Sequence, residues 1–278
     1  MNSADSDDAA LGAHQRREAL FHDQWARQSD PTGIDVDAFF EAPTAVENRF
    51  IRARMGPLRG KRILDIGCGL GEASVYFARH GALVTATDVA PQMVETTRHL
   101  ARLHGVTLNA VVSSAEELNV ADEAYDFVYV ANTIHHAASR ERLFGEIRRA
   151  LAPGGRFFSW DPLAYNPVIN VYRRMARHVR TRDEAPLTRA DVQLARRYFE
   201  DVETRMFWLF SLALFVKYFV WDRIHPDAQR YWKLVYQKQP LWWWRPLRNI
   251  DAVVCRLPGF RWLAWNIIIS GRKPTAPR

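Results

Sequence analysis

The stretch Ile63-Leu64-Asp65-Ile66-Gly67-Cys68-Gly69-Leu70-Gly71 decides the fold of this chain. A short apolar run leads directly into a turn with three alternating glycines, and helix-forming residues follow from Glu72. Glycine allows positive φ angles and lets a ligand approach the backbone closely. The stretch therefore predicts a strand, a tight ligand-binding turn and a helix. Because glycine suits any tight strand-to-helix turn, the rest of the sequence has to separate a binding turn from an ordinary one.

Short β-like runs alternate with helix-like runs along the middle of the chain. This alternation predicts βαβ units and a parallel sheet. Right-handed crossovers place all the loops that lead into helices at one edge of the sheet, where ligands of open α/β sheets bind. The predicted strands are 62–66, 83–88, 108–114, 126–131, 156–160, 202–209 and 262–269, and the predicted helices among the first five are 72–80, 91–104 and 139–151.

We expect a doubly wound α/β fold with a mostly parallel, seven-stranded sheet over residues 59–278. Residues 1–58 are expected to form a loose tail followed by a helical N-terminal cap. Apolar residues recur at helical spacing over 11–28 and 36–55, whereas residues 1–10 are acidic and polar.

An aromatic insertion at residues 210–258 precedes the last predicted strand. It is too long and too apolar for an unstructured loop, so we expect helices there, with breaks at Pro240 and Pro246. Core packing, a lid over a hydrophobic pocket and attachment to a membrane surface all suit such a segment. In the membrane interpretation, Trp242-Trp243-Trp244-Arg245 would lie at the level of the lipid headgroups.

The charge of the chain is concentrated near its C-terminus. The formal net charge is +7, and residues 201–278 hold 13 Lys/Arg against five Asp/Glu, together with eight of the ten tryptophans. This mixture is typical of interfacial surfaces, and no nucleic-acid-binding module accompanies it. Two cysteines are too few for a disulfide framework, and the N-terminus lacks the pattern of a secretory signal. We therefore expect a cytoplasmic protein with no nucleic-acid partner and possible peripheral membrane contact; the oligomeric state stays open.

Seventeen residues after Gly71, the second predicted strand ends in Asp88. A carboxylate there lies beside the glycine turn and can accept hydrogen bonds from both hydroxyls of a ribose. The alternative is that Asp88 only caps the following helix. A nicotinamide dinucleotide fingerprint would require glycine at position 72, where this chain has Glu72, so a pyrophosphate-bearing cofactor is disfavoured.

Three further motifs follow in order: Ser114 to Leu118, Tyr125 to Asn132 and Leu151 to Arg156. Together with the glycine turn and Asp88, they make residues 62–161 similar to the class I S-adenosylmethionine-dependent methyltransferases, in the small-molecule, type 11-like branch. The resemblance implies a Rossmann-like methyltransferase fold with S-adenosyl-L-methionine as the cofactor.

The same resemblance assigns roles to residues around the cofactor. The glycine turn would wrap the methionine part, Asp65 would hold its ammonium, and Asp88 would hold the ribose. Val89 and Met93 would flank the adenine, whose edge would meet Ala115 and Glu116. The residues implied for cofactor binding are Asp65, Gly67, Gly69, Gly71, Asp88, Val89, Met93, Ala115, Glu116, Ala131 and Asn132.

Methyl transfer to an oxygen or nitrogen benefits from a base, and histidine has a suitable pKa near 6.5, whereas no metal is needed. His135 and His136 follow the fourth predicted strand, and Asp161 ends the fifth. Adjacent strand ends therefore bring imidazole and carboxylate to one cleft, and we predict these three residues as catalytic, with His135 favoured as the base. Two other interpretations stay open: the histidines as pocket lining, and Asp161 as a turn residue before Pro162.

The predicted function is S-adenosylmethionine-dependent methyl transfer to an oxygen or nitrogen of a hydrophobic small molecule, a natural product of secondary metabolism or a lipid-like compound. The alternatives are carbon methylation of an isoprenoid or quinone-like acceptor, with or without cyclisation, and a binding module without turnover. Two cap-helix residues would close over the cofactor, and four residues after the fifth strand would line the acceptor pocket. These are His22 and Trp25, and Tyr165, Asn166, Tyr172 and Arg173.

Overall fold

A computed structural model describes residues 3–181, 184–236 and 242–275. Its core is one seven-stranded sheet with the strand order β3-β2-β1-β4-β5-β7-β6. Only β7 runs antiparallel to its neighbours, and the other paired strands are parallel. The predicted doubly wound, mostly parallel sheet is confirmed. The strands are β1 (Arg62–Ile66), β2 (Leu83–Asp88), β3 (Asn109–Val112), β4 (Tyr125–Ala131), β5 (Leu151–Pro162), β6 (Glu200–Phe207) and β7 (Asn266–Arg272).

The strand order reverses between β1 and β4, which pair directly from Ile63 opposite Phe127 to Ile66 opposite Val130. The connections after these two strands leave in opposite directions, so a crevice opens at their carboxyl ends. The glycine turn follows β1 at this point, and the histidine pair follows β4.

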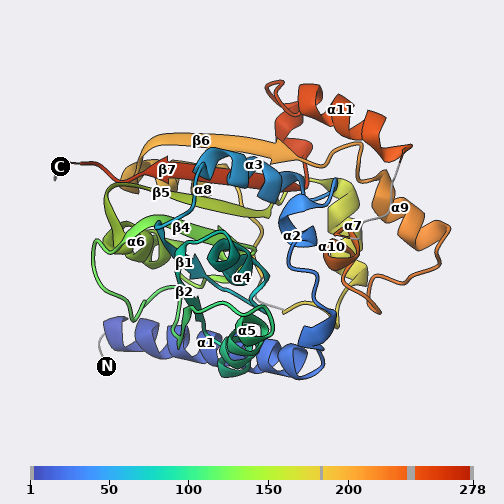
Figure 1. Ribbon diagram of the computed structural model, residues 1–278. Helices are drawn as coiled ribbons and strands as arrows, with labels where there is room; N and C mark the ends of the chain where they lie inside the picture. The colour runs from blue at the N-terminus through green and yellow to red at the C-terminus, as the bar shows by residue number, and fades with distance from the viewer. Residues whose placement is uncertain (1–2, 182–183, 237–241, 276–278) are drawn as a thin grey trace.

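Helices cover both faces of the sheet (Figure 1). One apolar core lies between the sheet and α6 (Arg140–Ala150) and α8 (Arg189–Tyr198), and includes the fully buried Phe144 and Phe157. The other lies beneath α3 (Val46–Met55), α4 (Glu72–Arg79) and α5 (Pro91–Leu103). Because both faces are buried, the sheet is a rigid support for the loops at its edge.

The N-terminal region differs from the prediction in two places. Helix α1 (Ser3–Arg27) already begins within the expected tail, and it lies along α5 (Figure 1). The single helix expected over 36–55 is divided into α2 (Ala38–Glu41) and α3. Pro43 causes the division, because a proline disfavours helical geometry in the residue before it, and Ala42 has the extended ψ of 140°.

The C-terminal insertion is helical, as predicted. It contains α9 (Ala213–Val220), α10 (Tyr231–Leu234) and α11 (Trp244–Val254), which pack with α7 (Pro167–Met175) around a separate aromatic cluster. Pro240 lies outside the described residues. The predicted break at Pro246 is wrong, because this residue lies in the first turn of α11, where a proline costs no hydrogen bond. The last strand begins at Asn266 and not at residue 262, since a 3-10 turn, η3 (Phe260–Leu263), precedes it.

Among the helices of the described ranges, none combines the length and the apolar character that a membrane-spanning helix needs.

Candidate active site

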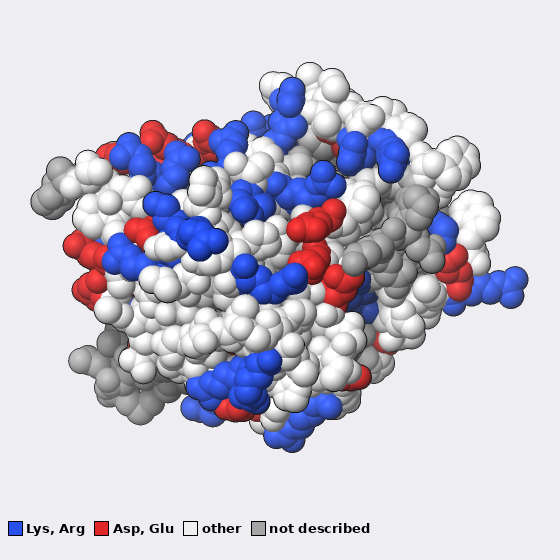
Figure 2. Space-filling view, viewed as in Figure 1, with Lys and Arg blue, Asp and Glu red and all other residues white. Residues whose placement is uncertain are grey.

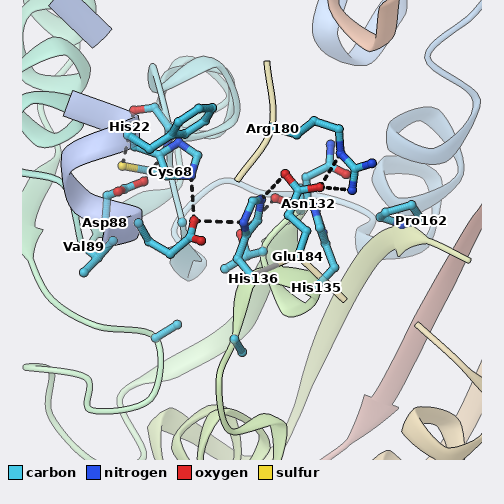
Figure 3. A pocket seen from close by; sticks show the side chains of 18 of the residues that line it. His22, Cys68, Asp88, Val89, Asn132, His135, His136, Pro162, Arg180 and Glu184 are labelled. Atoms are coloured by element: carbon cyan, nitrogen blue, oxygen red, sulfur yellow. Dashed lines mark hydrogen bonds and ion pairs between the residues drawn. The ribbon is translucent and has the colours of Figure 1, made fainter. Parts of the chain in front are cut away.

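A cavity of about 240 Å³ opens where β1 and β4 end. Its walls come from three parts of the chain: the loops after the parallel strands, one face of α1, and residues of α7 and the C-terminal insertion. Side chains that line it lie close together in Figure 3 although they are far apart in the sequence.

The glycines of this turn serve two purposes: they allow positive φ angles, and two of them allow close packing. All three glycines have positive φ angles, of 70°, 55° and 95° for Gly67, Gly69 and Gly71. A Cβ atom on Gly67 would lie 2.2 Å from Oγ1 of Thr133, and one on Gly71 would lie 2.9 Å from Cα of Thr97, so these two permit close packing. A Cβ atom on Gly69 would meet nothing within 4 Å. Gly67 and Gly69 line the cavity, whereas Gly71 does not and instead supports the turn against α5.

The carboxylate of Asp88 points towards the glycine turn. Its Oδ2 accepts a hydrogen bond from the Gly69 N–H at 3.0 Å, and its Oδ1 accepts one from the Ala90 N–H at 2.9 Å. The residue is 8% exposed and lines the cavity. Burial raises the pKa of this carboxyl group. Asp88 therefore fixes the start of α5 and also presents a carboxylate to the cavity.

Asp65 and Val89 also line the cavity, but Met93 does not. Oδ2 of Asp65 accepts a hydrogen bond from the Ser74 hydroxyl at 2.5 Å, and burial raises the pKa of Asp65 to about 7. Met93 is fully buried in a small cluster with Leu70 and residues of α1 and the β2–α5 connection. The prediction that Met93 flanks the adenine is wrong, because the side chain faces this cluster and not the cavity.

The predicted adenine and methionine residues Ala115, Glu116, Ala131 and Asn132 all line the cavity. Glu116 also makes two hydrogen bonds within the protein. Its Oε1 accepts one from the Ser139 N–H at 2.5 Å, and its Oε2 accepts one from the Gln15 side chain at 3.2 Å. It therefore connects α1 to the loop before α6.

His135 and Asp161 form a buried pair at the ends of β4 and β5. Nδ1 of His135 lies 2.8 Å from Oδ1 of Asp161, which also accepts the backbone N–H of His135 at 3.1 Å. Burial lowers the pKa of His135 well below 6.5 and raises that of Asp161 to about 8, so the pair has no net charge at pH 7. The Nδ1–H of a neutral imidazole then faces Asp161, and its Nε2 is free to accept a proton.

Asp161 is completely buried and does not line the cavity. The structure therefore places Asp161 against the imidazole of His135 and not at the cavity wall, which differs from the predicted position in direct contact with an acceptor. Its Oδ2 has no hydrogen-bond partner among the described residues.

His136 lies in a different electrostatic environment from its neighbour. Its Nδ1 is 3.0 Å from Oε2 of Glu18, which also lies 3.5 Å from Nε2 of His22, and its Nε2 is 4.0 Å from Oε1 of Glu184 (Figure 3). Burial disfavours the charged imidazole, but the hydrogen bond to Glu18 and the charge of Glu184 outweigh it and raise the pKa of His136. The raised pKa favours the protonated form of His136, whereas burial favours the neutral form of His135.

Four of the six residues predicted for the lid and the acceptor pocket line the cavity. His22, Trp25, Tyr172 and Arg173 line the cavity, whereas Tyr165 and Asn166 do not, and these two predictions are wrong. The hydroxyl of Tyr165 accepts the Arg189 N–H at the surface. Asn166 caps α7 by accepting the Ile169 N–H and donates to the Leu263 carbonyl.

The sequence interpretation missed much of the acceptor side. Glu18 recurs at helical spacing with the predicted His22 and Trp25 on one face of α1, so this residue could have been found. Trp25 contacts the C-terminal insertion, with the Arg230 guanidinium 4.3 Å from its ring centroid. The other missed lining residues come together only through tertiary packing: His14, Gln15, Phe21, Tyr129, Trp160, Arg180, Glu184, Arg230, Trp232 and Trp265.

Donor atoms of Glu18, His22 and His136 lie within 4.8 Å of one another, as do those of His135, His136 and Glu184. Histidine nitrogen and carboxylate oxygen are ligands for zinc and other divalent transition metals. The prediction that no metal takes part therefore stays a prediction, and these side chains are where it can be tested.

Comparison with known proteins agrees with the motifs. The sequence profile of a family described as "Methyltransferase domain" matches residues 64–159. A ubiquinone biosynthesis O-methyltransferase of Cereibacter sphaeroides is 37% identical over 99 residues, which are 36% of this chain and 40% of the relative. The methyltransferase GfsG of Streptomyces halstedii is 29% identical over 149 residues, 52% of each chain. The matches thus span about half or less of these relatives.

Among solved structures, the [4+2]-cyclase SpnF superposes with a TM-score of 0.56 at 20% identity, covering 84% of this chain and 81% of that one. At this identity the likeness concerns the fold alone. The name of that protein also illustrates that the fold hosts more than one kind of chemistry.

Proposed function

Residues 64–159 match a family described as "Methyltransferase domain", and we propose that this chain is a class I S-adenosylmethionine-dependent methyltransferase that transfers a methyl group to an oxygen or nitrogen of a hydrophobic small molecule. The observation that carries the proposal is the His135–Asp161 pair, which presents an imidazole base to the same cavity that the glycine turn and Asp88 line.

The residues present suit the cofactor. Gly69 leaves open space beside the backbone of the turn, and Asp88 offers carboxylate lone pairs to a ribose. Asp65 provides negative charge for an ammonium group. S-Adenosylmethionine, when bound, supplies a methyl group on a positively charged sulfur, which suits an in-line displacement.

The protein's own contribution is alignment and proton acceptance. Nε2 of His135 accepts the proton that an acceptor hydroxyl or amine loses, and Asp161 keeps the imidazole in the tautomer that leaves Nε2 free. Trp25, Tyr129 and Trp160 give the cavity apolar walls that exclude water and accommodate a hydrophobic acceptor.

The proposal is tested by incubating the protein with isotopically labelled S-adenosylmethionine and a lipophilic extract of the source cells. We expect a product that carries one labelled methyl group on oxygen or nitrogen, and loss of this product with the His135→Ala variant. A label on carbon in the purified product would instead support the carbon-methylation alternative. Binding of S-adenosylhomocysteine without any labelled product would support a binding module.

A second proposal concerns the source of the acceptor. Helix α9 is apolar on its outer face as well as its inner face: Val216, Phe219 and Val220 are exposed, and Trp221 is 74% exposed. The exposed Arg223 follows them, and α11 of the same insertion also carries basic residues. In Figure 2 the side of the molecule where α9 and α11 project shows mainly uncharged residues, with Lys and Arg side chains and a few acidic ones beside them. An apolar face with basic flanks suits the surface of an anionic phospholipid bilayer.

Sedimentation with phosphatidylglycerol-containing vesicles tests this second proposal. We expect the wild type to bind and the Val220→Ser/Trp221→Ser variant to bind at least about tenfold more weakly, because two apolar side chains no longer enter the bilayer. Leu20→Ser, which changes a residue that is 70% exposed on α1, should leave binding unchanged. Equal binding by all three proteins would contradict the proposal.

A further inference from the structure

The acceptor side of the cavity holds a half-buried guanidinium, that of Arg173, which makes no ion pair with a carboxylate of the described residues. Arg173 projects from α7 and donates hydrogen bonds to Oδ1 of Asn170 at 2.9 Å and to the Leu163 carbonyl at 3.1 Å. Both partners are neutral, and within the described part of the chain no ion pair joins Arg173 to an acid. Two of its five N–H donors are used, so three are available to a ligand.

The nearest carboxylate is already engaged by other cations. Glu184 pairs with Arg180 and lies 4.0 Å from Nε2 of His136 (Figure 3). Burial and the neighbouring Arg180 lower the pKa of Arg173 to about 10, and the charge of Glu184 offsets this only in part. Removing a charged guanidinium from water costs free energy unless a group of opposite charge pairs with it.

A second cavity, of about 830 Å³, meets the first at Arg173, Arg180 and Glu184. Its described lining adds Arg177 and His178, and His178 pairs with Asp227. Among the described lining residues, three guanidiniums therefore lie with one carboxylate, that of Glu184. The apolar walls of the first cavity therefore lead into a region with excess positive charge.

We propose that the acceptor carries an anionic group, a carboxylate or a phosphate, which binds Arg173 where the two cavities meet while its hydrophobic part lies in the first cavity. A planar guanidinium with free donors is the group that proteins use to bind both kinds of oxyanion. The inference rests on the proposed function, since it describes the substrate of that same site.

The carboxylate of the cofactor is a competing ligand for any arginine of this pocket. Arg230 is the more suitable partner for it: this side chain lies over Trp25 of α1, whose other cationic neighbour, Lys233, reaches Glu72 just after the glycine turn. Arg173 contacts the carbonyl that follows β5, on the acceptor side. The experiment therefore measures cofactor binding and acceptor binding separately.

The test is isothermal titration calorimetry of the full chain, saturated with S-adenosylhomocysteine, using decyl phosphate, decanoate and decanol as probes. We expect at least one anionic probe to bind about 10- to 100-fold more tightly than decanol, the range typical of a hydrogen bond to a charged group. Arg173→Gln should remove this preference. Arg174→Gln, which removes the same charge from an exposed neighbour on α7, should retain it.

Three outcomes would overturn the proposal. The first is equal binding of all three probes by the wild type, a result that does not depend on how any variant folds. The second is an equal loss of preference in both variants, which would indicate general charge attraction. The third is that Arg173→Gln weakens S-adenosylhomocysteine and leaves the probes unaffected. A wild type that does not bind S-adenosylhomocysteine at all would contradict the proposed function instead.

Discussion

The two halves of the cavity are built differently. The cofactor half consists of the glycine turn after β1 and the Asp88 carboxylate at the end of β2. It depends on positive φ angles in the turn and on the hydrogen bond that the Gly69 N–H donates to Asp88. The acceptor half is made from side chains that come from α1, the loop after β4, α7 and the C-terminal insertion. A local sequence motif therefore determines the first half, whereas tertiary packing determines the second.

The two halves also differ in charge. Asp65 and Asp88 line the cofactor half, which suits a ligand with a positively charged sulfur and an ammonium group. Arg173 and Arg180 line the acceptor half, where the neighbouring carboxylate, that of Glu184, pairs with Arg180. This difference in charge would favour the positively charged cofactor in the first half and an anionic acceptor in the second. Variants in each half can test this division.

The largest effect is expected from the base. His135→Ala should lower kcat by about 10²- to 10⁴-fold, because proton acceptance by a positioned side chain contributes that much. The affinity for S-adenosylhomocysteine, measured by calorimetry, should stay the same. His99→Ala, which changes an exposed histidine of α5, serves as the control. A loss of less than tenfold would mean that His135 only lines the pocket.

Asp88→Ala should show the opposite pattern. We expect the affinity for S-adenosylhomocysteine to fall about 100-fold or more, because two charged hydrogen bonds to the ribose are lost and the Gly69 N–H loses its acceptor. Decyl phosphate binding, measured in the same instrument, should change little. An unchanged cofactor affinity would remove Asp88 from the site and leave it as a helix cap only.

Trp25 connects the two halves, since its ring contacts Arg230 and Lys233. Trp25→Ala should increase the dissociation rate of S-adenosylhomocysteine about tenfold, which corresponds to one partly desolvated cation–π contact. Stopped-flow fluorescence measures this rate. If Leu20→Ala on the exposed face of α1 has the same effect, the change reflects helix stability and not the contact.

A smaller, pH-dependent effect is expected at Asp161. Because burial raises its pKa to about 8, the carboxyl group is protonated at pH 7, and asparagine resembles that form. Asp161→Asn should therefore retain kcat/KM at pH 7 but lack the increase above pH 8, where ionised Asp161 makes the imidazole of wild-type His135 more basic. Parallel pH profiles for the two proteins would show that Asp161 does not titrate in this range.

No effect is expected from metal removal. Treatment with EDTA followed by dialysis should leave methyl transfer unchanged, since displacement from a sulfonium does not need a Lewis acid. Restoration of a lost activity by zinc would assign the cluster of Glu18, His22 and His136 as a metal site.

The same contrast explains what the sequence could predict. The bounds of β1 and β2 match the predictions, as does the placement of Asp88 beside the glycine turn, because short strands and glycine turns have local signals. Met93, Tyr165 and Asn166 were misplaced because spacing along an element does not say which neighbour covers it. Glu184 and Arg230 carry no local signal, since each reaches the cavity only after distant segments have packed.

A crystal structure of the protein with S-adenosylhomocysteine tests the central claim most directly. The account predicts density for the methionine part against the turn at Gly67 and Gly69, and for the ribose hydroxyls at the Asp88 carboxylate. A nucleoside bound elsewhere, or a ribose with no contact to Asp88, would contradict it.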